Sequence, residues 1–314
     1  MWRVISGVFM GWSLGANDAA NIFGTGVTSR LIRFRTAMGL LSVFVLIGAV
    51  TEGSKCMHSL RNLGDLGINQ AFICTLSAAL AMTILTVLRI PASTSQAIVG
   101  AIIGVTLLVS SPNWKQFGTM VACWVMTPIG AAVIGYLLYR LFDAVLYLRV
   151  LNTRQVERFL KITMIVAGCY GSYALGANNL ANTTGVYVNT GMLSVTQGAV
   201  IGALAIGLGA ITYSHRVIET VGNRITLIGP QGAVIATLAH SITVHIYTQI
   251  GVPVSSSQAI VGAVAGIGFV RGMRAVNRTV LGQIFLGWLM TPVLAGLLAC
   301  GGIILMQVYP SWVH

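Results

Sequence analysis

The chain repeats itself, and this repeat constrains its fold more than any other feature. Residues 14–21 read LGANDAAN, and residues 175–182 read LGANNLAN, at an offset of 161. Further along, SQAIVGA at 95–101 recurs identically at 257–263, at an offset of 162. Because two separate segments keep nearly the same spacing, the match is not a chance one. We therefore predict a duplicated pair of halves, residues 1–150 and 151–314.

The composition indicates that both halves lie in a membrane. Hydrophobic residues make up 56% of the chain and charged residues only 8%, whereas a soluble domain carries about 25% charged residues. This excludes a soluble enzyme and a secreted disulfide scaffold. The net charge of +12 does not indicate nucleic-acid binding, because the basic residues are scattered singly between apolar runs.

Each half contains about five apolar segments, and about 20 apolar residues are enough to span a bilayer. The two short segments at 92–110 and 254–270 begin with Pro and Ser residues, which predicts broken or re-entrant helices. We therefore expect an all-α polytopic membrane protein. The ten segments lie near 2–28, 37–51, 68–88, 92–110 and 116–141 in the first half, and near 160–188, 192–213, 225–250, 254–270 and 279–307 in the second.

The basic residues predict the orientation of these segments. If each half crosses five times and the N-terminus is outside, four basic residues lie outside, and the other 14 of the 18 lie in cytoplasmic loops. This agrees with the excess of Lys and Arg in cytoplasmic loops of membrane proteins. An odd number of crossings inverts the second half, as in many secondary transporters, and puts both termini outside. The four outer residues are Arg3, Lys55, Arg61 and Lys115.

The first repeated motif offers hard oxygen ligands. Gly, Asn and Asp are poor helix formers, so we expect unwound backbone at 15–21, lining a cavity between the halves. Amide and carboxylate oxygens suit a small cation, and an intramembrane carboxylate indicates function. The alternative is that the asparagines only cap half-helices. The candidate cation ligands are Asn17, Asp18, Asn21, Asn178, Asn179 and Asn182.

The second repeated motif is typical of a helix start. Pro followed by hydroxyl residues and then an apolar run predicts an N-terminus capped by Ser, and such an end attracts anions. Two such ends could converge on a small tetrahedral oxyanion, although ordinary capping explains the same residues. The candidate anion ligands are Ser93, Thr94, Ser95, Ser255, Ser256 and Ser257.

Few other ionisable residues fall in the apolar segments. Glu52 and Lys55 are three residues apart and are expected to pair on a helix. For His240 and His245, polar packing is favoured over a role in proton binding.

The two GAN motifs and the two Ser-Gln motifs together resemble the inorganic phosphate transporter (PiT) family, over essentially the whole chain. The resemblance implies inverted repeats, a homodimer in the plasma membrane, and phosphate symport with sodium or protons. It places the phosphate ligands on the six hydroxyl residues named above, and the cation ligands on Asn17, Asp18, Asn21, Asn178 and Asn182. The fullest family signature has Asp in both halves, whereas this chain has Asn179 opposite Asp18.

We therefore predict a phosphate importer with sodium as its coupling ion and no other cofactor. A sulfate permease on the same fold is the main alternative. Sulfate carries no proton at neutral pH, so Asp18 or Glu52 as a hydrogen-bond acceptor favours phosphate. An anion channel would not need the cation motif, and no motif typical of an intramembrane enzyme is apparent.

Overall fold

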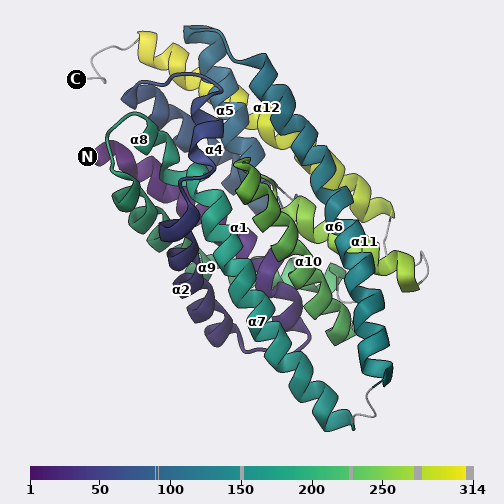
Figure 1. Ribbon diagram of the computed structural model, residues 1–314. Coiled ribbons are helices and arrows are strands. Elements are labelled where there is room, and N and C mark those ends of the chain that lie inside the picture. Colours follow the sequence, from purple (N-terminus) through teal and green to yellow (C-terminus); the bar gives the residue numbers. More distant parts are fainter. Residues whose placement is uncertain (89, 91, 149–151, 226–228, 272–277, 309–314) are drawn as a thin grey trace.

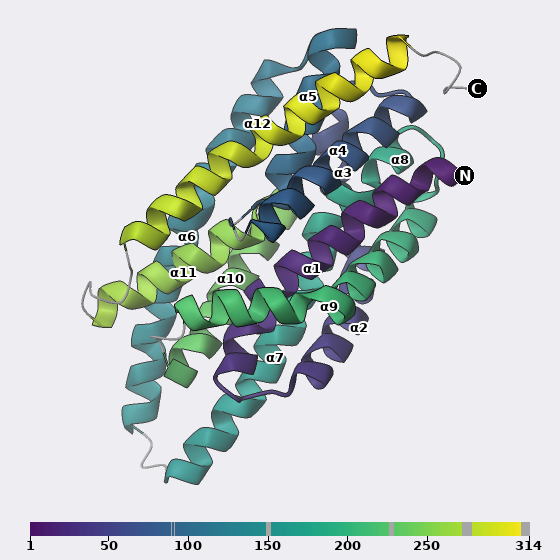
Figure 2. The same ribbon diagram turned by 180° about the vertical axis from the view of Figure 1, so that it is seen from behind.

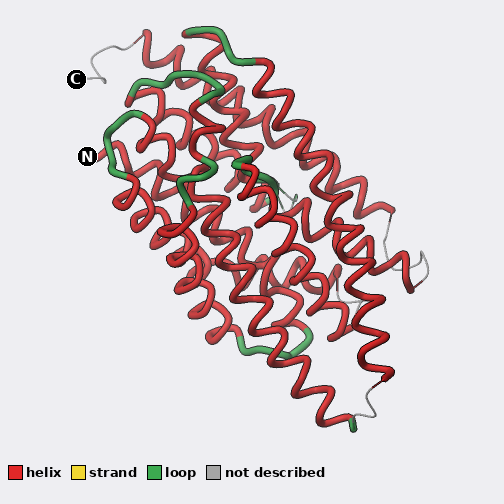
Figure 3. The backbone as a smooth tube through the Cα atoms, in the orientation of Figure 1, coloured by secondary structure: helices red, strands yellow, loops and turns green. Residues whose placement is uncertain are grey.

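The chain forms a long bundle of helices, shown from two sides in Figures 1 and 2. This computed structural model describes all residues except 89, 91, 149–151, 226–228, 272–277 and 309–314. The predicted boundary between the halves, 150/151, lies outside the described residues. Short loops join the helices, and the described chain contains no strand (Figure 3).

The helices of the first half are α1 (Ile5–Thr28), α2 (Phe34–Glu52), the short α3 (Met57–Arg61), α4 (Ile68–Val87), α5 (Thr94–Val109) and α6 (Trp114–Leu148), after a 3₁₀ turn, η1 (Trp2–Val4). The second half contains α7 (Thr153–Leu180), a π-helical turn, η2 (Ala181–Gly185), α8 (Val186–Asn189), α9 (Val195–Ile225), α10 (Gly229–Ile250), α11 (Ser256–Arg271) and α12 (Arg278–Val308).

The surface of the bundle is apolar along its length. On α6, large apolar side chains are exposed every four residues, at Val125, Ile129, Val133, Leu137 and Leu141. Such a stripe is stable against lipid but would associate or aggregate in water. Within the described chain, six stretches are long and apolar enough to cross a bilayer: Phe34–Glu52, Ile68–Val87, Trp114–Ala144, Thr153–Asn189, Val195–Ile218 and Phe285–Val308. The protein is therefore a multi-pass membrane protein.

The two halves contact each other reciprocally. Gly15 of α1 packs against the carbonyl of Ile206, and Gly176 of α7 packs against the carbonyl of Val45. At the offset of 161, Gly15 corresponds to Gly176 and Val45 corresponds to Ile206, so the two contacts are equivalent. Reciprocal contacts of this kind indicate twofold symmetry between the halves.

α1 and α7, which contain the two copies of the first motif, run antiparallel. Gly7, near the start of α1, lies against Tyr187, just beyond the end of α7, and Gly26 at the other end of α1 lies against Met164. Figures 1 and 2 show the same opposed directions for α1 and α7. Opposed directions are what an inverted repeat requires.

The two short helices meet at their starts. α5 and α11 have 16 residues each, fewer than a bilayer span needs. The hydroxyl of Ser95 donates to the carbonyl of Val254 over 2.8 Å, and that of Ser257 donates to the carbonyl of Ala92 over 3.2 Å. The prediction of broken helices at these two segments therefore holds, and their N-termini lie together inside the bundle.

One expectation about the backbone is wrong. α1 continues without a break through residues 15–21, and only the second motif is followed by an irregular turn, η2. Asn17 and Asp18 bond to residues of α4 and α5, and Asn21 bonds to Asp18 within α1, so these side chains are satisfied while the backbone stays helical. Gly15 serves the close approach to α9 and does not unwind the helix.

The close helix contacts yield a test of packing. A methyl group added at Gly209 of α9 would meet the backbone of Trp12, whereas one added at Gly39 of α2 would meet nothing within 4 Å. We expect Gly209→Ala to lower the free energy of unfolding by about 1–3 kcal/mol. Gly39→Ala removes a poor helix former and is expected to be neutral or stabilising. Thermal unfolding in detergent measures both, and equal effects would contradict the packing described here.

Candidate functional site

The centre of the bundle holds a hydrogen-bonded chain of polar side chains that crosses both halves. We call Asp18, Asn21, Thr94, Ser95, Asn179 and Asn182 the central network. All six side chains are buried, with Asp18 only 1% exposed. Unpaired polar groups are costly in such a place, which makes their bonding partners informative.

Each oxygen of the Asp18 carboxylate has a hydrogen-bond donor beside it. Asn21, one turn later on α1, donates its amide to Oδ1 over 3.3 Å. Thr94, the first residue of α5, lies 3.2 Å from Oδ2 of Asp18 and 3.3 Å from Oδ1 of Asn179. A hydroxyl has one proton, so Thr94 donates to one of these acceptors at a time and links the two repeated motifs.

The network continues from Asn179 to the helix starts. The amide of Asn182 donates to Oδ1 of Asn179 over 2.8 Å and to Oγ of Ser95 over 2.9 Å. Ser95 in turn donates to Val254, immediately before the second Ser motif. The repeated GAN motifs and the repeated Ser motifs are therefore brought together in one place.

Each predicted hydroxyl residue already has a partner. Ser93 and Ser255 accept from the backbone N–H groups of Gln96 and Gln258 as N-caps, at 3.4 and 3.3 Å. The hydroxyls of Ser255 and Ser257 are 2.9 Å apart, and Ser256 lies 2.7 Å from Nε2 of His240. Capping and convergence thus occur together, although the sequence alone left them as alternatives.

Two predicted residues face away from the network. Asn17 donates to Thr86 of α4 over 3.1 Å, and Asn178 donates to Thr248 of α10 over 3.0 Å. Thr86 and Thr248 are themselves related by an offset of 162, so the repeat contained a signal that could have identified these partners in advance. Asn178 also donates to the carbonyl of Val252 and accepts from the N–H of Val254, so it positions the segment that leads into α11.

Four buried polar atoms at these motifs have no hydrogen-bond partner. They are Nδ2 of Asn179, Oδ1 of Asn182, and Oε1 of Gln96 and of Gln258. The two glutamines are equivalent residues of the Ser-Gln motif and were not among the predicted ligands. Burying an unpaired polar group costs about 1–3 kcal/mol, so these atoms are candidates for contact with a ligand.

Glu52 takes part in a separate cluster. It pairs with Lys55 over 3.0 Å, as predicted, and its other oxygen lies 3.0 Å from His245 and 2.9 Å from Gln249. Tyr170 completes this cluster through Nδ1 of His245. These bonds leave Asp18, not Glu52, as the carboxylate beside the helix starts.

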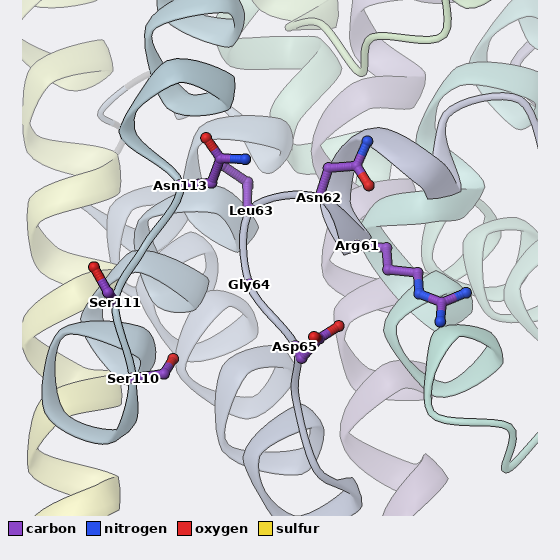
Figure 4. A pocket seen from close by; sticks show the side chains of 8 residues that line it. All are labelled: Arg61, Asn62, Leu63, Gly64, Asp65, Ser110, Ser111 and Asn113. Carbon is purple, nitrogen blue, oxygen red and sulfur yellow. The ribbon is translucent and has the colours of Figure 1, made fainter.

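A surface pocket of about 360 Å³ shares no residue with the central network or with the Glu52 cluster. Figure 4 shows it between the loop that follows α3 and the loop that follows α5. It contains none of the predicted site residues. Its lining consists of Arg61, Asn62, Leu63, Gly64, Asp65, Ser110, Ser111 and Asn113.

Comparison with known proteins identifies the family of this chain. A model described as the phosphate transporter family matches residues 14–299. The chain belongs to this phosphate transporter family. The family is one of transporters, so the protein is a transporter and not an enzyme.

Relatives of this family member cover nearly all of its length. A putative phosphate permease of Methanocaldococcus jannaschii is 31% identical over 93% of each chain. A sulfate permease of Bacillus subtilis is 28% identical over 93% of this chain and 84% of its own. A solved structure described as the sodium-dependent phosphate transporter superposes with a TM-score of 0.86 over 98% of each chain, at 22% identity, and shows that the fold is shared.

The bonds of Asn178 yield a test of the site's construction. Asn178→Ala removes the buried bonds to Val252 and Val254, together with those to Thr248 and Cys56, whereas Asn17→Ala removes the bond to Thr86. We expect Asn178→Ala to cost about 1–3 kcal/mol of unfolding free energy, and more than Asn17→Ala. Thermal unfolding in detergent compares the two variants. A larger loss in Asn17→Ala would show that Asn178 does not hold this segment.

Proposed function

We propose that this transporter imports inorganic phosphate by symport with sodium. One observation carries the proposal: a buried carboxylate, Asp18, is bonded to the start of one of two helices whose N-termini meet inside the bundle. Membership of the family supports phosphate as the substrate. The names of the Methanocaldococcus jannaschii relative and of the structural neighbour are consistent with phosphate and with sodium.

Phosphate would bind between the starts of α5 and α11. The first N–H groups of each helix and the helix dipole attract an anion, and Ser93, Thr94, Ser95, Ser255, Ser256 and Ser257 supply hydroxyls around the same point. A bound phosphate would replace some of the present bonds among these residues. Asp18 would accept a hydrogen bond from the P–OH group that phosphate retains at neutral pH. Sulfate has no such proton and could not donate this bond.

Sodium would bind beside phosphate, on oxygens of Asp18, Asn21, Asn179 and Asn182, which are hard ligands. The other two predicted ligands, Asn17 and Asn178, bond to Thr86 and Thr248 and would reach the cation only if these bonds were exchanged. Support comes from Oδ1 of Asn182, which is buried and has no partner. The cation would offset the charge of Asp18 and of the anion, so each would favour binding of the other.

The proposal includes the architecture. Residues 1–150 and 151–314 would form two inverted repeats that rock about the central site, in a homodimer in the plasma membrane. Both termini would lie outside. Support comes from Arg30, Arg33, Arg35, Arg154 and Arg158, which follow α1 or begin α2 and α7, at the end of the bundle opposite the N-terminus (Figures 1 and 2). Basic residues at that end favour it as the cytoplasmic side.

A sulfate permease remains the second candidate, because the Bacillus subtilis relative carries that name at 28% identity. Sulfate needs hydrogen-bond donors and no acceptor. An anion channel is less favoured because it would not need the Asn and Asp residues. Competition by sulfate and accumulation against a gradient distinguish these functions.

The central test is Asp18→Asn. Labelled phosphate uptake into proteoliposomes is measured with an inward sodium gradient, with and without excess sulfate. We expect wild type to accumulate phosphate and sulfate to inhibit weakly. Asp18→Asn should lower uptake at least about tenfold, because a buried hydrogen bond to a charged group is worth about 1.5–3 kcal/mol.

Glu157→Gln is the matched control, since it also neutralises a carboxylate but at an exposed pair with Lys161. It should leave uptake within about twofold of wild type, because exposed pairs are worth little. Accumulation of sulfate in place of phosphate would overturn the assignment of the substrate.

A second test restores the carboxylate that the second motif lacks. The two donors near Asn179 both contact Oδ1, and its Nδ2 has no partner, so Asn179→Asp keeps the bonds and adds a negative charge. We expect uptake to need more sodium and to depend on its concentration more steeply. Asn62→Asp, an exposed change in the loop after α3, is the control. An unchanged sodium dependence would place the cation away from Asn179.

A further inference from the structure

His240 occupies a position that its sequence context does not reveal. It lies in α10, is fully buried, and its Nε2 is 2.7 Å from the hydroxyl of Ser256. Ser256 is the first residue of α11, one of the two helix starts of the site. The other ring nitrogen, Nδ1, is buried without a hydrogen-bond partner.

The contact between His240 and Ser256 corresponds to the contact between Asp18 and Thr94 in the first half. Thr94 is the first residue of α5 and is equivalent to Ser256 at the offset of 162. Among the described Asp, Glu, Lys, Arg and His side chains, only Asp18 and His240 are buried. Each helix start thus contacts one ionisable side chain, an acid in the first half and a base in the second.

The base is not duplicated. The offset of 162 that relates Thr86 to Thr248 on the same two helices places Ala78 opposite His240. Since the framework of α4 and α10 repeats without a histidine in α4, packing of the repeat does not require one.

Other ionisable groups near His240 are engaged elsewhere or carry no formal charge. α1 supplies Asp18, and the described side chains of α11 supply none. His245 of α10 contacts Tyr170 and Tyr173 of α7. The remaining ionisable side chains beside these residues are Tyr247 on α10 and Cys169 on α7. On α6, Tyr139 packs in the apolar cluster that contains Ala239, and Asp143 accepts from Gln231. The charged groups of α7 lie near its first residues, and those of α6 at its two ends: Arg154, Glu157, Arg158, Lys161, Lys115 and Arg140.

Protonation of His240 would change what Ser256 can donate. A neutral imidazole accepts at Nε2 when Nδ1 carries the proton, so the hydroxyl of Ser256 donates to it. An imidazolium donates from both nitrogens, and Nε2 then donates to Ser256 Oγ. The proton of the Ser256 hydroxyl becomes free to donate to an anion at the start of α11.

We propose that His240 is a proton-binding residue of the transport cycle, which takes up one proton with each phosphate and releases it with phosphate inside. The inference rests on the proposed function, since it assigns a second coupling ion to the same site. The proton adds one positive charge and one free hydroxyl donor beside the anion. A buried imidazolium needs a negative charge beside it, and bound phosphate at the start of α11 would supply that charge, so the proton binds with phosphate and leaves with it.

The test separates the two coupling ions in proteoliposomes. Labelled phosphate is supplied with equal sodium on both sides and a fixed external pH, while the interior is made more alkaline. Because the external pH is the same in every arm, the ionic form of external phosphate does not change. Wild type should accumulate phosphate, by up to about tenfold per pH unit for one coupled proton. His240→Gln keeps an amide that can bond to Ser256, and should accumulate up to about tenfold less than wild type per pH unit while it retains uptake driven by sodium. Conversion of phosphate to its more charged form inside is the same for both proteins and does not produce this difference.

His245→Gln is the matched control, since His245 belongs to the Glu52 cluster, and it should respond to both gradients. His240→Asn serves as the second variant if His240→Gln does not assemble. A dye trapped inside reports the protons that enter during sodium-driven uptake, and their number per phosphate should fall by about one in the variant.

The outcomes distinguish the two proposals. If wild type takes up phosphate with sodium but does not respond to the proton gradient, or if His240→Gln responds as wild type does, the role of His240 is overturned. If wild type takes up phosphate with neither gradient, the proposed function itself fails.

Discussion

The hydroxyl of Ser95 bonds to the carbonyl of Val254, the hydroxyl of Ser257 bonds to the carbonyl of Ala92, and these reciprocal bonds hold two helix starts together inside the bundle. The first backbone N–H groups of α5 and α11 have no partner within their own helices, and Ser93 and Ser255 each accept a hydrogen bond from only one of them. The bonds place two positive helix ends side by side, which is stable only with negative charge or polar acceptors nearby. Asp18, the asparagines and the glutamines around these ends meet that requirement, so the polar site follows from the meeting of the helices.

Within this symmetric framework, the ionisable residues are not symmetric. Asp18 faces Asn179 across Thr94, and His240 stands where the other half has Ala78. Relative to a site with Asp in both motifs, these two changes remove one negative charge and add a group that binds a proton. The close glycine contacts are equivalent in the two halves, and this difference in charge arises from side chains.

Much of this arrangement could be predicted from the repeat. The offsets of 161 and 162 identified the residues that meet, and Pro and Ser at 92–110 and 254–270 indicated helices that start inside the membrane. The repeat did not show which way side chains point: Asn17 and Asn178 bond to Thr86 and Thr248, away from Asp18. Helix propensity was misleading at 15–21, because bonds to neighbouring helices outweigh the weak preferences of Gly and Asn. His240 has no repeat partner, and its contact with Ser256 depends on how α10 packs against α11.

The central network also explains how a cation and an anion can be coupled over a short distance. Thr94 has one proton and two acceptors, Asp18 and Asn179, and Asn182 bonds to both Asn179 and Ser95. A cation on Asp18 would withdraw that oxygen as an acceptor and favour donation by Thr94 to Asn179 or to an anion. The same change reaches Ser95, and through it Val254, at the start of the opposite short helix. Because the bonds cross both halves, binding of either proposed ion would alter the interface about which the halves would move, and by linkage the effect would be mutual.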